Sequence, residues 1–192
     1  MPVLSRADGE RLIYAMTVGM GRHDPEAVSR LLKAATSAHL ATKTLDLALE
    51  GRVVPELVHV TGAVLWQPVE QRLSSDEIDR YRSEIGHVSA DTSGAGGLLT
   101  GAERKRLVLA TAAQFGDGPE SGQQAQAVLE WAETVRDSVR ELEDILNGRL
   151  LPYIPDDDDE RSIEVREVEG LPADQRATYR RALAQLKTRY SR

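Results

Sequence analysis

The chain has 192 residues, of which 41% are apolar and 4% aromatic, and a net charge of −7. Its length suits one large domain, or one domain with an appendage. The absence of cysteine excludes disulfides, thiolate catalysis and cysteine-ligated metal, and the negative charge argues against wholesale coating of nucleic acid. No apolar run approaches the ~20 residues that span a bilayer, and no signal-peptide pattern is present. We therefore expect a cytoplasmic protein, or a component of a particle assembled in the cytoplasm.

Helical periodicity begins near the N-terminus. Ser5 can cap a first helix over about 8–19. Asp24-Pro25 then marks a second start, because aspartate is a good N-cap and proline fits the first helical position. Small and apolar residues repeat every three or four positions from there to about Glu50. This stripe predicts a core helix of a bundle, with a coiled-coil dimer seam as the alternative.

Residues 53–69 are ambiguous. They are rich in β-branched side chains and bounded by Pro55 and Pro68. Apolar positions from Val54 onward fit one helical face, whereas the alternation typical of a strand breaks at residues 63–66. The pattern favours a nearly buried helix, and a strand is the alternative.

Three capping boxes of the form S/T-x-x-E/Q predict three further helices, because the two side chains each satisfy a free backbone N–H. The boxes are Ser74–Glu77, Thr100–Glu103 and Ser121–Gln124, and the helices cover about 75–86, 101–115 and 122–147. The last helix carries an apolar stripe of Val128, Ala132, Val135, Val139, Leu142 and Leu146.

The organisation changes at Leu151-Pro152. Residues 156–169 hold eight acids and two arginines, a charge of −6, whereas residues 171–192 hold six cations and one acid, a charge of +5. The fold class is therefore mostly α. A bundle of about six helices over 1–150 precedes an arm over 151–192, formed by an extended acidic segment with a possible short strand and a basic C-terminal helix. No internal repeat is evident.

No cofactor, metal or catalytic residue is expected. The glycine loop 93–101 has the spacing of a phosphate-binding loop, but Ala102-Glu103 stands where Lys-Ser/Thr is required. Four consecutive aspartates at 156–159 lack the ligand spacing of a calcium loop. Both segments are better explained as solvated connections.

The histidines are too scattered to present two imidazoles on one helical face. They are His23, His39, His59 and His87. Glu56–His59 and Glu84–His87 have the Glu-x-x-His spacing that holds di-metal centres when two helices carry it. A metal-dependent helical-bundle enzyme is therefore kept as a second alternative.

Residues 162–166 alternate like a short strand, which would need a partner strand from this chain or from another. A self-contained extended loop is the favoured interpretation, and pairing with another chain is the alternative. We predict a non-enzymatic interaction or assembly protein (an adaptor, or a structural or regulatory subunit) that binds other proteins or itself through the arm. The expected contact residues are Ile163, Val165, Tyr179, Arg180, Leu183, Leu186 and Tyr190. The first alternative is a helical nucleic-acid-binding regulator that uses the cations Arg104, Lys105, Arg106, Arg180 and Arg181.

Overall fold

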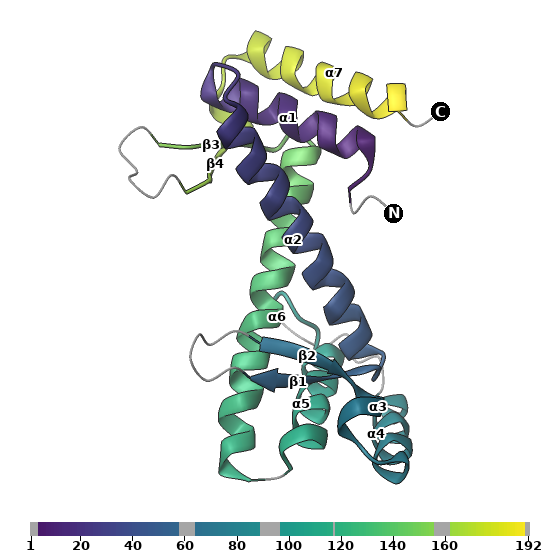
Figure 1. Cartoon of the computed structure of the whole chain (residues 1–192). Helices are drawn as coiled ribbons and strands as arrows, with labels where there is room; N and C mark the ends of the chain where they lie inside the picture. The colour runs from purple at the N-terminus through teal and green to yellow at the C-terminus, as the bar shows by residue number, and fades with distance from the viewer. Residues whose placement is uncertain (1–3, 58–63, 89–96, 117, 156–161, 191–192) are drawn as a thin grey trace. The chain divides into compact units, whose positions relative to one another are not determined.

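The computed structural model describes residues 4–57, 64–88, 97–116, 118–155 and 162–190, with only the backbone of Pro119. Within them the protein is mostly helical, with seven α-helices and two small antiparallel sheets (Figure 1). The described chain forms two compact units. Unit 1 combines residues 1–40 with 138–192, and unit 2 comprises residues 41–137. The predicted fold class is confirmed.

The predicted helices are present with nearly the expected bounds. They are α1 (Arg6–Met20), α2 (Pro25–Leu49), α4 (Ser75–His87), α5 (Gly101–Phe115), α6 (Pro119–Leu146) and α7 (Ala173–Tyr190). A single short turn, α3 (Val69–Arg72), and a 3-10 turn, η1 (Val168–Gly170), were not predicted.

Local capping explains where most of these helices begin. The hydroxyl of Ser5 accepts from the amide of Asp8, and Asp24 Oδ1 accepts from two amides in the first turn of α2. The Thr100 and Ser74 boxes close as predicted, each with the cap amide donating to a glutamate 2.8 Å away. The prediction for Ser121 was wrong, because α6 already begins at Pro119 and Ser121 lies inside it.

The predicted helix over 53–69 was also wrong. Val53–Leu57 is strand β1, and it pairs antiparallel with β2, Val64–Pro68. The residues between them, His59 included, lie outside the described part of the chain. The ladder tolerates both prolines because neither occupies a hydrogen-bonded position. Val69 N donates to the Arg52 carbonyl, and bonded and non-bonded pairs alternate from there. The pairs Val53–Pro68 and Pro55–Trp66 are therefore non-bonded, and no ladder N–H is needed at either proline.

A second hairpin follows α6. Strand β3 (Leu150–Tyr153) pairs antiparallel with β4 (Glu164–Glu167). The possible short strand around residue 164 is therefore present, and it pairs with β3 of this chain instead of forming an extended loop. Pro152, which faces Val165, again occupies a non-bonded position. Val168 N donates to the Arg149 carbonyl at 2.9 Å, and bonded and non-bonded pairs alternate from there.

The two hairpins belong to an internal repeat, so the expectation that none exists was wrong. The order α1, α2, β1, β2, α3, α4 recurs as α5, α6, β3, β4, η1, α7. The sequence recurs with it, since residues 45–55 (LDLALEGRVVP) match 142–152 (LEDILNGRLLP), and residues 7–21 match 102–116 with Arg-Leu at the same place.

Equivalent residues also make equivalent contacts. Arg11 of α1 donates to the Leu146 carbonyl, and Arg106 of α5 donates to the Leu49 carbonyl. Gly148 has a φ of +69° and lies against Tyr179, Arg180 and Leu183. Gly51 has a φ of +70° and lies against the corresponding Tyr81, Arg82 and Ile85.

Each compact unit mixes the two repeats. In unit 1, α1 from the first repeat packs against β3 and α7 from the second, and α1 lies alongside α7 in Figure 1. In unit 2, α5 from the second repeat packs against β1 and α4 from the first. The long helices α2 and α6 each supply residues to both units.

Each unit has its own apolar core. The core of unit 1 is built on Leu12, Met16, Leu31, Ile145, Leu151, Val168, Tyr179 and Leu183. Unit 2 has two clusters, one around Leu45, Leu107 and Val128 and one around Val54, Ile78 and Tyr81. Because unit 1 draws buried residues from both sides of residue 150, its core includes the predicted arm. The division of the chain at residue 150 stays a prediction.

Candidate functional site

The apolar side of α7 faces its own chain. Tyr179 is 1% exposed, Leu183 is 3% exposed, and the Tyr179 ring stacks on Tyr14 of α1 with 5.9 Å between centroids. Leu186 is half-buried, and Tyr190 lies beneath the guanidinium of Arg6 at 4.9 Å. The expected partner-binding stripe therefore serves mainly as the surface by which α7 joins the core of unit 1.

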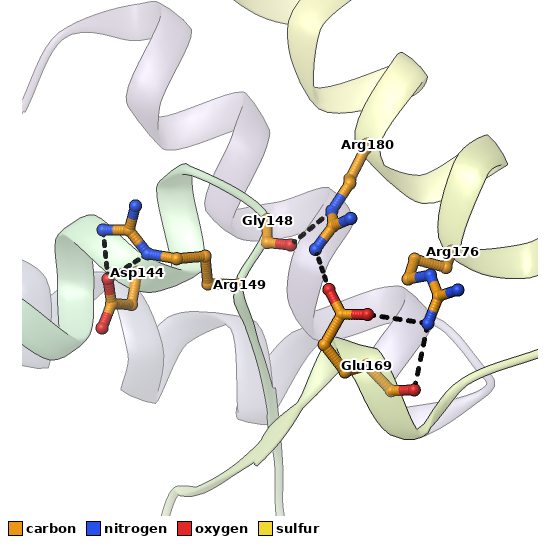
Figure 2. Close-up of polar contacts among 6 residues, drawn as sticks. All are labelled: Asp144, Gly148, Arg149, Glu169, Arg176 and Arg180. Carbon is orange, nitrogen blue, oxygen red and sulfur yellow. Dashed lines mark hydrogen bonds and ion pairs between the residues drawn. The ribbon is translucent and has the colours of Figure 1, made fainter. Parts of the chain in front are cut away.

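A carboxylate at the end of the second hairpin fixes the start of α7. Glu169 in η1 pairs with Arg180 at 2.5 Å and with Arg176 at 2.7 Å, and Figure 2 shows it between the two guanidinium groups. Arg180 Nε also donates to the Gly148 carbonyl at 3.2 Å. The hydrogen bond from Arg180 lowers the pKa of Glu169. Arg180, predicted to bind a partner, thus ties α7 to the hairpin.

The repeat carries a counterpart of this ion pair. Glu70 pairs with Arg82 at 2.9 Å, at the positions that correspond to Glu169 and Arg180. Our sequence predictions missed both glutamates. The recurring Val-Glu at 69–70 and 168–169, and Tyr-Arg at 81–82 and 179–180, were the available signal.

Strand β4 forms an open edge of the second sheet. β3 packs against α1 and pairs with β4, whereas the only described strand that pairs with β4 is β3. In an antiparallel ladder, bonded and non-bonded pairs alternate. Because Val168 N bonds to Arg149, the bonded positions on β4 are Arg166 and Glu164, and the backbone N–H and C=O of Val165 and Glu167 point away from β3.

The side chains of β4 divide between two faces. Ile163, which precedes the strand, and Val165 are half-buried against the core of unit 1. On the other face, Glu164 accepts from the hydroxyl of Tyr153 at 2.7 Å, and the Arg166 guanidinium lies 5.3 Å from the Tyr153 ring and donates to the Gly19 carbonyl at 3.1 Å. The two predicted residues therefore support the edge, and the exposed Glu164 and Arg166 flank it.

The first repeat closes the corresponding edge. Pro68 of β2 occupies the position of Glu167 in β4, facing Val53 as Glu167 faces Leu150. Proline offers no N–H for a further strand, and prolines on edge strands block added pairing. Trp66 of β2 in addition packs on Trp131, with ring centroids 5.1 Å apart. Trp66 and Pro68 on β2 correspond to Val165 and Glu167 on β4, and only the β4 pair has a backbone N–H at both positions.

The cations predicted for nucleic acid are largely engaged within the chain. Arg104 pairs with Glu133, Arg106 donates to the Leu49 carbonyl, and Arg180 pairs with Glu169. Lys105 and Arg181 are exposed, but they belong to different units. Arg181 lines a shallow surface on α7 with Ala184, Gln185, Thr188 and Arg189. Three of the five cations therefore lie on α5 of unit 2 and two on α7 of unit 1.

One of the two predicted Glu-x-x-His pairs does not begin on a helix, as the di-metal motif requires. Glu56 lies in strand β1, not on a helix, and it pairs with Arg72 and accepts from Gln67 at 3.1 Å. His87 closes α4 through Nδ1, 2.6 Å from the Ser83 carbonyl. Among the described residues, no group of three or more metal-binding side chains gathers. His59, the aspartates 156–159 and glycine-loop residues 93–96 lie outside the described chain.

Unit 2 also contains a polar cleft between α4 and α5. It encloses about 370 Å³ and is lined by Glu77, Arg80, Tyr81, Glu84, Leu109, Ala112, Ala113, Gln114 and Gly116. The Tyr81 hydroxyl and Gln114 Oε1 are buried there with no hydrogen-bond partner. Burial raises the pKa of the Tyr81 hydroxyl.

Comparison with known proteins gives no relative. No family model, curated protein or solved structure matches the chain. No helix in the described part of the chain is long and apolar enough to cross a membrane.

Proposed function

We propose that this protein is a non-enzymatic assembly component that docks on another protein chain through the outer edge of β4. The observation that carries the proposal is the pair of outward backbone N–H groups at Val165 and Glu167, whose counterpart edge in the first repeat ends in Pro68. An added strand would satisfy these groups by main-chain hydrogen bonds, which supply affinity in strand addition. We further propose that docking takes place in the cytoplasm.

The support beneath the edge favours docking. A strand that receives a partner must hold its own shape, and β4 is held by β3, by the core under Val165 and by the ion pairs of Glu169 just after the strand. The sequence analysis expected the apolar residues of the C-terminal helix to contact the partner. In the present proposal these residues pack inside the protein, and the edge of β4 is the docking element.

The test is a proline at the outward position. Val165→Pro removes an N–H that points away from β3, so it blocks strand addition while the β3–β4 ladder stays intact. A proline placed elsewhere in unit 1, such as Ala184→Pro, is not a suitable control, because it would break helix α7. The matched control is Val165→Thr, which keeps the N–H and the β-branched shape at the same residue.

The readout is the mass of the native complex in cell extract, with circular dichroism of the purified variants to confirm folding. We expect the complex to shrink for Val165→Pro and to persist for Val165→Thr. A folded Val165→Pro variant that remains in a complex of unchanged mass overturns the proposal.

A further inference from the structure

We infer that the chain which adds to β4 is the β4 strand of a second copy of this protein, in an antiparallel pairing centred on Val165. The inference rests on the proposed function and names its partner. Two copies would then join their hairpins into one four-stranded sheet, with β4 next to β4 at its centre.

The backbone restricts the possible registers. Outward N–H and C=O groups occur at the odd-numbered positions Val165 and Glu167. If an added strand extends the ladder by one residue, the same alternation gives Ile163 an outward position. Two symmetric copies must therefore place odd-numbered residues in the hydrogen-bonded pairs. Three registers satisfy this condition near the middle of the strand, centred on Glu164, Val165 or Arg166.

Charge selects one of the three. Centring on Glu164 sets that carboxylate directly against its own copy, and centring on Arg166 does the same for two guanidinium groups. Centring on Val165 instead sets Glu164 opposite Arg166 of the second copy, and the two-fold axis repeats the pair. Opposite charges directly across a strand pair are favourable and like charges are unfavourable, so the strand is complementary to itself in this register alone.

The neighbouring residues agree with this register. Glu164 and Arg166 are exposed on the same face of β4, where Tyr153 holds both from within the chain. The cross-strand ion pairs would therefore form between side chains that are already oriented. Val165 would pair with Val165 of the second copy on the opposite face, above the apolar core of each unit.

The experiment uses charge reversal in the full chain. Arg166→Glu alone, or Glu164→Arg alone, sets like charges opposite each other, whereas the double variant Glu164→Arg with Arg166→Glu restores two opposite pairs. Mixing the two single variants restores them as well, but only between unlike copies. Arg181→Glu makes the same charge change on exposed α7 of the same unit, away from the edge.

Sedimentation equilibrium of purified protein measures association, over about 10–500 µM because an interface of this small size gives weak binding. We expect a reversible dimer for the wild type and Arg181→Glu. Each single reversal should weaken dimerisation by about tenfold or more, since two favourable pairs become two repulsive ones. The double variant and the mixture should recover it, with circular dichroism showing all variants folded.

Two results overturn the inference. One is a wild type that stays monomeric over the whole range, and the other is a folded single-reversal variant that dimerises as the wild type does. The proposed function fails separately. If the wild type is monomeric but Val165→Pro still shrinks the native complex, β4 docks on a different protein. If Val165→Pro leaves that complex unchanged, docking through this edge is wrong altogether.

Discussion

Gly19 of α1 lies directly against the backbone of Pro152 in β3, so closely that a Cβ added to Gly19 would overlap the Pro152 carbonyl oxygen. The contact brings the first helix of one repeat onto the hairpin of the other. Pro152 is also the residue that faces Val165 across the β3–β4 ladder, so the same contact backs the proposed docking edge.

Gly19→Ala should therefore destabilise unit 1. The methyl group would meet backbone, not a flexible side chain, and α1 must shift to make room. We expect a loss of at least ~2 kcal/mol in the free energy of unfolding, measured by denaturant titration. Gly9→Ala on the same helix is the control. It meets no atom within 4 Å and should raise stability by ~0.5–1 kcal/mol. Equal effects of the two changes would contradict the close contact.

The internal repeat predicts that two half-chains assemble with each other. Fragments 1–97 and 98–192 each contain one repeat, but each compact unit takes elements from both. Co-expressed fragments should therefore copurify and unfold cooperatively, as judged by size-exclusion chromatography and thermal melting. Fragments that fold separately as stable monomers would show that the exchange of α1 and α5 is not needed for folding.

The two equivalent tyrosines should respond differently to loss of the hydroxyl. Tyr81 buries its hydroxyl without a hydrogen-bond partner, whereas the Tyr179 hydroxyl lies 3.4 Å from the Leu150 carbonyl. Tyr81→Phe should leave stability unchanged or raise it by up to ~1–3 kcal/mol, because a buried unsatisfied group is removed. Tyr179→Phe should cost about 0.5–1.5 kcal/mol. Chemical denaturation compares them, and a larger loss for Tyr81→Phe would contradict this assignment.

Glu169 should contribute a pH-dependent part of the stability. Its pKa is lowered from 4.5, chiefly by the hydrogen bond from Arg180, so its carboxylate stabilises the fold fully above that value. The contribution is lost as the pH falls from 4.5 through the folded pKa. Glu169→Gln should thus destabilise the protein at neutral pH, and its difference from the wild type should shrink in acid.

Thermal melts across pH test this expectation. Glu167→Gln removes the same charge two residues away, at a side chain that forms no ion pair with the described residues, and it controls for the loss of a charge alone. A Glu169→Gln deficit that persists undiminished well below pH 4.5 would contradict the role of the ion pair.

The buried face of α6 differs from the predicted apolar stripe at one position. Ile145, which the predicted stripe omitted, is 2% exposed in the core of unit 1, whereas Leu142 packs at its margin and is only partly buried. Ile145→Ala should cost about 2–5 kcal/mol, and Leu142→Ala clearly less. Urea unfolding midpoints decide between them, and a larger cost at Leu142 would restore the predicted stripe.

The sequence by itself determined the helices and most of their beginnings. Periodicity and caps such as Ser5, Asp24 and Thr100 act within a few residues, so they can be recognised without knowing the fold. Ser121 shows the limit of this reasoning, because a capping pattern does not form a cap when the helix has already begun at Pro119.

Only the tertiary structure decided what pairs with what. Val53–Leu57 is a strand because it pairs with Val64–Pro68. β4 pairs with β3, and no local sequence pattern specifies that pairing. Tyr179 and Leu183 could equally have faced a partner until α1 covered them. The open edge at Val165 was likewise invisible in the sequence, because the direction of a backbone N–H follows from the register of the neighbouring strand and not from the residue that carries it.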